Sequence, residues 1–128
     1  MDEVVKLIKA AKLFFLATEN DGQPDVRPMG SVFPVNGKLY FVLAKPMNLF
    51  KELMDNDKIA ISAYDGKNIL RLSATAVSDD NADVIEELYK AAPPLKNLFP
   101  ESVIAPFYLK NATAKIGEFG KEPVSCNF

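Results

Sequence analysis

The sequence predicts an α+β domain, mainly β, in which six antiparallel strands form a small barrel with three peripheral helices. Short apolar runs, several with period-two alternation, recur along the chain and are typical of strands. Turn signals separate these runs at Asn20-Asp21-Gly22, Asn36-Gly37 and Asp65-Gly66. Three other segments carry apolar residues at helical spacing. The length of 128 residues corresponds to one domain, residues 1–128.

The N-terminal part is predicted to form a helix and then three strands. Asp2 can cap a helix whose apolar residues recur at helical spacing up to Ala11. Residues 13–18 (LFFLAT) are a nearly continuous apolar run, so we expect a strand that is buried on both faces. The second predicted strand covers residues 24–33 and the third covers residues 38–44.

The second predicted strand has an interrupted hydrogen-bond ladder. Pro24 and Pro28 cannot donate to a ladder, and a glycine inside a strand, here Gly30, often marks a bulge or a close backbone approach. Two interpretations stay open. The segment is either an edge strand, where strand prolines usually occur, or a strand against which a ligand lies.

The middle of the chain is predicted to contain one helix and two strands. The helix begins near Lys45-Pro46, or at Asn48 as its N-cap, and buries an apolar face. Residues 59–63 and 69–77 are the strands. Arg71 lies on one face of the second of these, and it either points to water or reaches a ligand on a partner subunit.

The C-terminal part is predicted to form a helix and a last strand region. Ser78-Asp79-Asp80 caps the helix, which runs to about Ala91. A short helical turn at residues 95–99 follows. The last strand region covers residues 103–119 and is split near Lys110. The tail after residue 120 is either a loose end or a strap for a dimer.

The composition excludes several classes of function. The formal net charge is −2 and no long basic run occurs, so we expect no nucleic-acid partner. No stretch approaches the roughly 20 apolar residues of a membrane span, so we expect a cytoplasmic protein with no membrane partner. With no histidine and one cysteine, Cys126, the chain cannot build a Ser-His-Asp triad, a Cys-His pair or a His/Cys zinc site, and we expect no metal.

A phosphorylated cofactor is the ligand that the remaining features favour. A helix N-terminus offers unsatisfied N–H groups and partial positive charge, which suit a phosphate. Arg27, Lys45 and Lys51 are candidate cations around the predicted helix start. The proline-interrupted strand can present free backbone groups to a planar ring. Together these features indicate a flavin.

The ordered segments FFLAT-ENDGQPDVRPMG, NGKLYFVLA, ISAYDG, LRLSATAVSDD and FYLKNATAKIGEFG resemble the pyridoxamine 5′-phosphate oxidase-like, FMN-binding split-barrel family. The similarity spans about residues 14–119 and is greatest to the general stress protein and nitroimidazole-reductase-like branches. The resemblance implies a six-stranded antiparallel split β-barrel that forms a homodimer, with FMN at the subunit interface.

The resemblance also implies which residues bind the cofactor. The Arg-Pro strand runs along the flavin, the end of the third strand follows the ribityl chain, and the segment entering the next helix holds the phosphate. The implied cofactor-binding residues are Arg27, Pro28, Met29, Gly30, Val42, Leu43, Ala44, Lys45, Asn48 and Lys51. The last segment lacks the Ser or Thr and the lysine common in relatives, so Lys45 or Asn48 would have to compensate.

The function implied is an FMN-dependent oxidoreductase that passes electrons from NAD(P)H to a small-molecule substrate such as a nitroaromatic or a quinone. No side chain is an obvious general acid, so no catalytic residue is assigned. Two alternatives stay open: a non-catalytic flavin- or cofactor-binding stress or sensor module, and a structural dimerisation domain that has lost its ligand.

Overall fold

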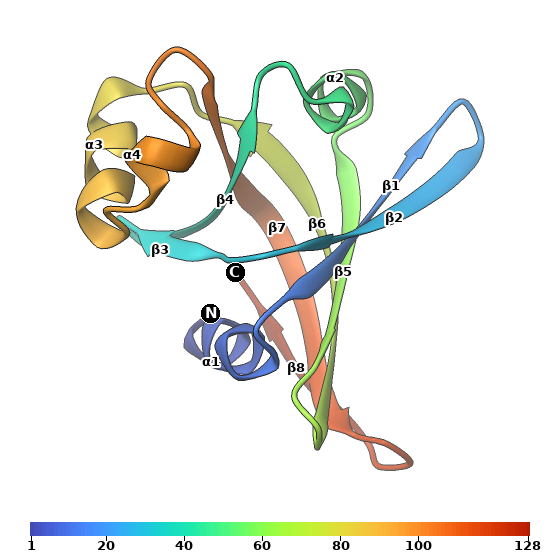
Figure 1. Ribbon diagram of the computed structural model, residues 1–128. Helices are drawn as coiled ribbons and strands as arrows, with labels where there is room; N and C mark the ends of the chain where they lie inside the picture. The colour runs from blue at the N-terminus through green and yellow to red at the C-terminus, as the bar shows by residue number, and fades with distance from the viewer.

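The computed structural model describes residues 1–128 as one curved antiparallel sheet with four helices around it (Figure 1). The helices are α1 (Asp2–Ala11), α2 (Asn48–Asp55), α3 (Ala82–Ala91) and α4 (Leu95–Leu98). The strands are β1 (Phe14–Asn20), β2 (Gln23–Met29), β3 (Phe33–Val35), β4 (Lys38–Ala44), β5 (Lys58–Tyr64), β6 (Asn68–Ser78), β7 (Ile104–Glu118) and β8 (Val124–Asn127). The predicted α+β, mainly β class is confirmed, with two more strands than expected.

The sheet is open along one side. Its order is β2-β1-β5-β6-β7-β4-β3, with β8 paired to β7. β2 pairs only with β1, and β4 pairs with β3 only from Lys38 to Tyr40. From Phe41 to Ala44, β4 is hydrogen bonded to β7 alone. We call the space between β2 and this part of β4 the sheet opening; Figure 1 shows α2 at its upper end.

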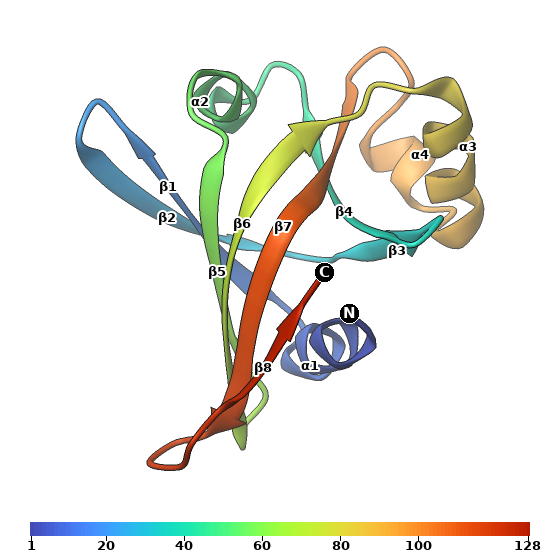
Figure 2. The same ribbon diagram turned by 180° about the vertical axis from the view of Figure 1, so that it is seen from behind.

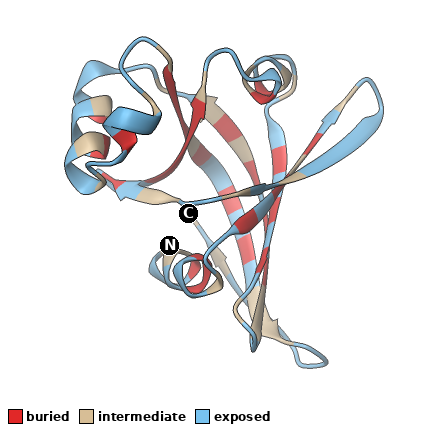
Figure 3. Ribbon diagram, in the orientation of Figure 1, coloured by how far each residue is buried: buried red, intermediate tan, exposed pale blue.

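The core is made of two clusters, which lie on opposite faces of β4. The larger one joins α1 and α2 to the inward side chains of the central strands. The smaller one packs α3 and α4 against β3 and the outer part of β4. Buried and exposed residues therefore alternate along β5 and β6, as Figure 3 shows. The helices α1 and α2 pack in the larger cluster, whereas α3 and α4 pack on the opposite face of β4. No helix covers the convex face of β5, β6 and β7 (Figure 2).

The first strand is not buried on both faces, so that prediction is wrong. Burial alternates along β1, with Phe14 and Leu16 in the core and Phe15 45% exposed. A continuous apolar run hides this alternation because its outward residues are apolar too. Phe15 points outward and therefore exposes an aromatic side chain on the convex face.

The second predicted strand is two strands in the structure. β2 ends at Met29, β3 begins at Phe33, and residues 30–32 belong to neither. β2 lies at one end of the sheet order and pairs on one side only, so the edge-strand interpretation is confirmed. The prolines of this strand are tolerated there because an edge strand has one side without ladder bonds.

The last strand is continuous, which corrects the predicted split near Lys110. β7 runs through Asn111, whose φ of 52° lies in the left-handed region, and the ladder to β6 shifts register between Ser73 and Thr75. Asparagine tolerates this conformation better than most residues. The sequence signal therefore marked a bulge and not a strand end.

The chain termini and helix caps also differ from expectation. The tail is not loose, because β8 pairs with β7 and places Cys126 opposite Ala114. Asn81, not residues 78–80, caps α3 by accepting hydrogen bonds from the N–H groups of Asp83 and Val84. Met1 occupies the N-cap of α1, so Asp2 lies inside the first turn.

None of the four helices has both the length and the hydrophobicity that crossing a membrane requires.

Candidate functional site

The residues predicted to hold a cofactor lie on both sides of the sheet opening. The first group is on β2 or directly follows it: Arg27, Pro28, Met29 and Gly30. The second group ends β4 and enters α2: Val42, Leu43, Ala44, Lys45, Asn48 and Lys51. The fold thus brings two segments that are separate in sequence to the same opening. Their role as cofactor ligands stays a prediction.

Arg27 is held by groups of its own chain. Its Nη1 donates to the hydroxyl of Thr18 at 2.9 Å and to the carbonyl of Leu16 at 3.3 Å. Its Nη2 donates to the carboxylates of Asp25 at 3.0 Å and of Glu52, on α2, at 3.1 Å. The side chain is 21% exposed. Two carboxylates therefore neutralise the guanidinium, and a phosphate placed beside it would meet their negative charge.

The junction between β4 and α2 has an uncapped helix start. Met47 is the N-cap, so Asn48 is the first helical residue and not the cap that one reading of the sequence predicted. No side chain accepts from the first N–H groups of α2, and its first turn contains no acidic residue. Lys45 forms an ion pair of 3.2 Å with Asp80, in which both side chains are well exposed. Lys51 is exposed and belongs to none of the ion pairs.

The end of β4 can present only backbone to a ligand. The side chains of Val42 and Leu43 are buried in the two core clusters, and Ala44 is half-buried. The N–H of Ala44 donates to the thioether sulfur of Met47 at 3.3 Å, a weak acceptor. On the side of the sheet opening this stretch has no strand partner.

Residues 30–32 carry free backbone groups beside a cavity. They form no hydrogen bond within the chain through backbone or side chain. A side chain at Gly30 would meet no atom within 4 Å, so open space borders the backbone there. The cavity, of about 390 Å³, lies between this segment, α1 and the end of α3, with Lys9 and Lys12 in its wall. Volumes of this size are typical of small-ligand pockets.

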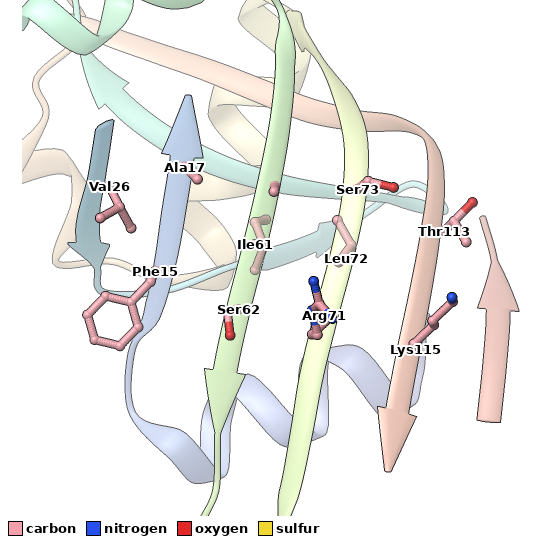
Figure 4. Close-up of a pocket in the computed structure, with 11 residues that line it drawn as sticks. Phe15, Ala17, Val26, Ile61, Ser62, Arg71, Leu72, Ser73, Thr113 and Lys115 are labelled. Carbon is pink, nitrogen blue, oxygen red and sulfur yellow. The ribbon is translucent and has the colours of Figure 1, made fainter. Parts of the chain in front are cut away.

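A shallow groove of about 400 Å³ lies on the convex face, across β2, β1, β5, β6 and β7. Its outward side chains include Phe15 and Val26 at one end and Arg71 and Lys115 at the other, as Figure 4 shows. The outward orientation of Arg71 follows from the alternation of its strand and was predicted. Lys115 was not singled out, because its pairing with Arg71 depends on the register between β6 and β7.

Tyr40 ties β4 to the entrance of α3. Its hydroxyl donates to the carboxylate of Asp79 at 2.7 Å, and the ring is almost fully buried. Burial and this hydrogen bond together raise the pKa of Tyr40 well above its usual value. The neighbouring Asp80 pairs with Lys45, so two successive acids bind residues of β4 and of the segment that follows it.

Residues 1–105 match the family described as pyridoxamine 5′-phosphate oxidase (PNPOx_N). The solved structure of a NimC/NimA family protein from Clostridium acetobutylicum is 32% identical, with a TM-score of 0.93 over 100% of this chain and 92% of that one. General stress protein 26 from Bacillus anthracis is 14% identical, with a TM-score of 0.76 over 99% and 97% of the two chains, and shows the fold alone.

Two further solved structures share the fold and are described by their ligands. An FAD-binding protein from Mesorhizobium loti is 16% identical, with a TM-score of 0.61 over 91% and 92% of the two chains. The heme storage protein HutZ from Vibrio cholerae is 15% identical, with a TM-score of 0.66 over 95% and 93%. No curated protein matches this chain. The match over residues 1–105 and the 32% identity over the full chain show that this protein belongs to the pyridoxamine 5′-phosphate oxidase family.

Proposed function

We propose that this protein binds FMN at the sheet opening and acts as an FMN-dependent oxidoreductase. The observation that carries the proposal is the segment of residues 30–32, whose backbone groups are free beside open space. A flavin ring has a polar edge that needs such donors and acceptors. Membership of a family whose name denotes an oxidase supports the redox role.

The phosphate would bind at the start of α2. The first N–H groups of the helix lack a side-chain cap, no acid lies in the first turn, and Lys51 is a free cation. Lys45 would join them when its exposed ion pair with Asp80 opens, which costs little because such pairs contribute less than about 1 kcal/mol. Asn48 adds a side-chain amide at the first helical position. The donor set therefore fits a phosphate.

The rest of the cofactor would follow the two edges of the opening. The ribityl chain would lie along the backbone of Val42, Leu43 and Ala44, and the ring along residues 27–30. Arg27 would contribute rigidity more than charge, because its guanidinium already joins β2 to Glu52 of α2. Its role would be to hold the two sides of the site at a fixed separation.

Bound FMN would supply hydride and electron transfer, which the side chains of this chain cannot perform. The protein would orient the ring through residues 29–31, and the lysines bordering the adjacent cavity would attract an anionic substrate. A nicotinamide donor and a small acceptor, such as a nitroaromatic or a quinone, are the proposed substrates. No side chain is assigned as a general acid.

We further propose a homodimer in which the convex face meets a second copy. This face carries apolar side chains that are unusually exposed for a monomer, with Phe15 at 45% and Val26 at 61%. Tyr64 lies on the same side of β5, in the outward half of its alternation. A second copy would remove these side chains from water.

A non-catalytic binding module is the second candidate. It is favoured by the fold shared with a heme storage protein. The chain has no histidine, so a heme would need a ligand such as a tyrosine, methionine or cysteine. Flavin binding needs no such ligand, and this is why the flavin reading is preferred.

The first experiment is the visible spectrum of the purified protein after desalting, with and without added FMN. A retained flavin spectrum that NAD(P)H bleaches, and that an acceptor restores, supports the oxidoreductase. Retained flavin without bleaching supports the binding module. A colourless protein that does not retain FMN contradicts the proposal.

The site assignment is tested by comparing FMN with riboflavin. Lys45→Gln with Lys51→Gln should weaken FMN binding by about 3–6 kcal/mol in total, since hydrogen bonds to charged groups contribute about 1.5–3 kcal/mol each. Riboflavin, which lacks the phosphate, should bind the variant as it binds the parent. Lys58→Gln with Lys67→Gln, on β5 and the β5–β6 turn, is the matched control and should change neither affinity.

A further inference from the structure

The cavity between α1, the connection from β2 to β3 and the end of α3 has apolar walls with two lysines among them. Four residues of α1 and its C-cap line it, Val5, Ile8, Lys9 and Lys12, and their spacing of three and four positions places them on one face of the helix. Residues 30–34 form the opposite wall. Figure 1 shows α1 below this connection. The cavity shares no lining residue with the groove of the convex face.

The two lysines of the cavity have no acidic partner. Neither Lys9 nor Lys12 takes part in any of the ion pairs of the structure, and neither side chain donates a hydrogen bond. No carboxylate lines the cavity. An anion that enters from water therefore meets positive charge that no group of the chain neutralises.

Lys12 occupies a backbone position that favours other residues. It is the C-cap of α1, and its φ of 73° lies in the left-handed region. Helices that end in this conformation usually do so with glycine, and sometimes with asparagine, because a Cβ is crowded there. The chain thus carries a cation where the backbone alone would favour a neutral residue. Such a residue is a reason to look for a function of its side chain.

The wall opposite the lysines supplies a backbone donor. The N–H groups of residues 30–32 have no acceptor within the chain. With the flavin on residues 29–31, the N–H group of Val32 is the donor left for the cavity. Carboxylate oxygens accept hydrogen bonds from backbone N–H groups and from lysines, so both walls suit the same ligand group.

The charge around the cavity suits a ligand with one negative charge. Lys12 and Ala92, the C-caps of α1 and α3, both line it. A helix C-terminus carries about half a negative charge, so two of them offset about one of the two lysine charges. The remaining charge of about +1 is neutralised by a carboxylate. A phosphate monoester, with a charge of about −1.5 to −2, would exceed it.

We infer that this cavity is a binding site for an apolar monocarboxylate. The carboxylate binds to Lys9 and Lys12 and accepts a hydrogen bond from the N–H group of Val32. The apolar part of the ligand lies against Ile8 and Phe33. Because the cavity borders the residues proposed to orient the flavin, this ligand is the anionic substrate. That last step rests on the proposed function, whereas the binding itself does not.

The test uses octanoate as the probe and octanol as its neutral analogue, each titrated into flavin-free protein at low ionic strength and followed by the backbone amide signals in NMR. The wild-type protein should bind octanoate at least tenfold more tightly than octanol, and octanoate should shift the amide signal of Val32. Lys9→Gln and Lys12→Asn should each weaken octanoate about fivefold, the upper range for an exposed ion pair, and leave octanol unchanged. Lys12→Asn should not lower the melting temperature, because asparagine tolerates the left-handed region.

Lys6→Gln is the matched control, because Lys6 is an exposed lysine of the same helix that does not line the cavity. Equal weakening by this control would overturn the inference in favour of a diffuse charge effect. Equal affinity of the wild-type protein for octanoate and octanol, or no binding of octanoate, would overturn it as well. Ala91→Leu narrows the cavity without altering charge and should weaken both ligands, whereas Ala10→Leu, at an exposed alanine of α1 outside the cavity, should weaken neither.

The same titration on FMN-loaded protein separates the inference from the proposed function. Octanoate that binds and changes the visible flavin spectrum supports both. Octanoate that binds and leaves that spectrum unchanged supports the binding site and contradicts its role as the substrate site. A protein that binds octanoate but retains no FMN contradicts the proposed function and supports the binding site. Retained FMN without octanoate binding overturns the inference and leaves the flavin proposal standing.

Discussion

The two arginines of the chain have opposite environments, and their substitution should have opposite effects on stability. Arg27 is four-fifths covered and holds Thr18, Asp25 and Glu52 together, whereas Arg71 is exposed and unpaired. Arg27→Ala leaves the buried Thr18 hydroxyl and the half-buried Glu52 carboxylate without their donor. We expect a loss of about 1.5–3 kcal/mol in the free energy of unfolding by urea.

Arg71→Ala is the matched control for that measurement. An exposed side chain without partners changes stability by no more than about 0.5 kcal/mol. Removal of its repulsion with Lys115 should make the small change favourable. Equal destabilisation by both substitutions would show that the Arg27 cluster does not fasten α2 to β2.

Tyr40 should make stability depend on pH in the alkaline range. Its pKa is raised in the folded state, so the retained proton contributes stability below the unfolded value of about 10 and that contribution is lost as pH rises further. Tyr40→Phe should cost about 1.5–3 kcal/mol at pH 7, because the hydrogen bond to the Asp79 carboxylate is lost. The difference between the two proteins should shrink above pH 10.

Urea unfolding at pH 7 and at pH 11 checks this expectation. Tyr108→Phe serves as the control, because the Tyr108 hydroxyl forms no hydrogen bond within the chain. A difference between wild type and Tyr40→Phe that stays constant with pH would mean that the Tyr40 proton is not tied to the fold.

For single residues, the sequence predicts which face a side chain points to better than it predicts which residue that side chain contacts. Period-two alternation predicts that Arg71 points outward, and the structure confirms it. The same reasoning cannot reveal that Arg27 meets Glu52, because these residues are 25 positions apart and join only when α2 crosses the sheet opening. Ion-pair partners depend on tertiary placement, which a local pattern does not contain.

Among the elements, α2 is unusual because its N-cap is Met47, which offers no oxygen to the first N–H groups. Met47→Ser and Met47→Asp should each stabilise the helix by about 1 kcal/mol in thermal or urea unfolding. Aspartate gains further from the helix dipole. If the flavin phosphate sits at this helix start, aspartate should weaken FMN binding much more than serine, through charge repulsion.

The pair of variants separates capping from charge. FMN affinity that is unchanged from wild type in both Met47→Ser and Met47→Asp would place the phosphate elsewhere. A loss in both would mean that the uncapped N–H groups themselves are the phosphate donors, because any cap competes for them. Stability and affinity would then change in opposite directions at a single position.

The sequence predicts which helices and strands form more accurately than it predicts the residues at which they begin and end. The strong hairpin signals place β1–β2, β3–β4 and β5–β6 correctly, since the Gly22, Gly37 and Gly66 turns have the positive φ angles that such signals require. The caps of α1 and α3 were misassigned by one residue or more because several acidic or polar residues compete at each start. The asparagine within β7 looked like a break because a bulge and a strand end use the same residue type.

At the scale of the whole molecule, the exposed apolar side chains of the convex face should control association. Phe15→Glu with Val26→Glu should convert a dimer to a monomer at micromolar concentration, because like charges would be buried without partners in the interface. Sedimentation velocity measures the change. Leu98→Glu is the control, since Leu98 is 71% exposed on α4 and away from this face.

A wild-type protein that sediments as a monomer at the same concentration would contradict the dimer. A control that dissociates as readily as the double variant would move the interface to α4. Persistence of the dimer in the double variant would place the interface on another face of the sheet.

The strand order could not be predicted from the residues alone. Hairpin neighbours follow from turn signals, but the pairing of β7 with β4 joins residues that are 60 or more positions apart. The sheet opening, and with it the proposed site, exists only because β3 leaves β4 after three residue pairs. The backbone groups of residues 30–32 lack hydrogen-bond partners for the same reason. In the sequence, only the nearby prolines and Gly30 indicate this.

The position of β7 also has a consequence for a chain that is still being synthesised. β4 has one short partner, β3, until β7 emerges, and β7 is the next-to-last strand. The first hundred residues can therefore form hairpins but cannot join the two halves of the sheet. On a ribosome, which adds about 5–20 residues per second, the nascent chain keeps unpaired strand edges until β7 has been synthesised. Attachment of a C-terminal fusion leaves this delay unchanged, whereas a pause before residue 104 lengthens the period in which those edges can meet another chain.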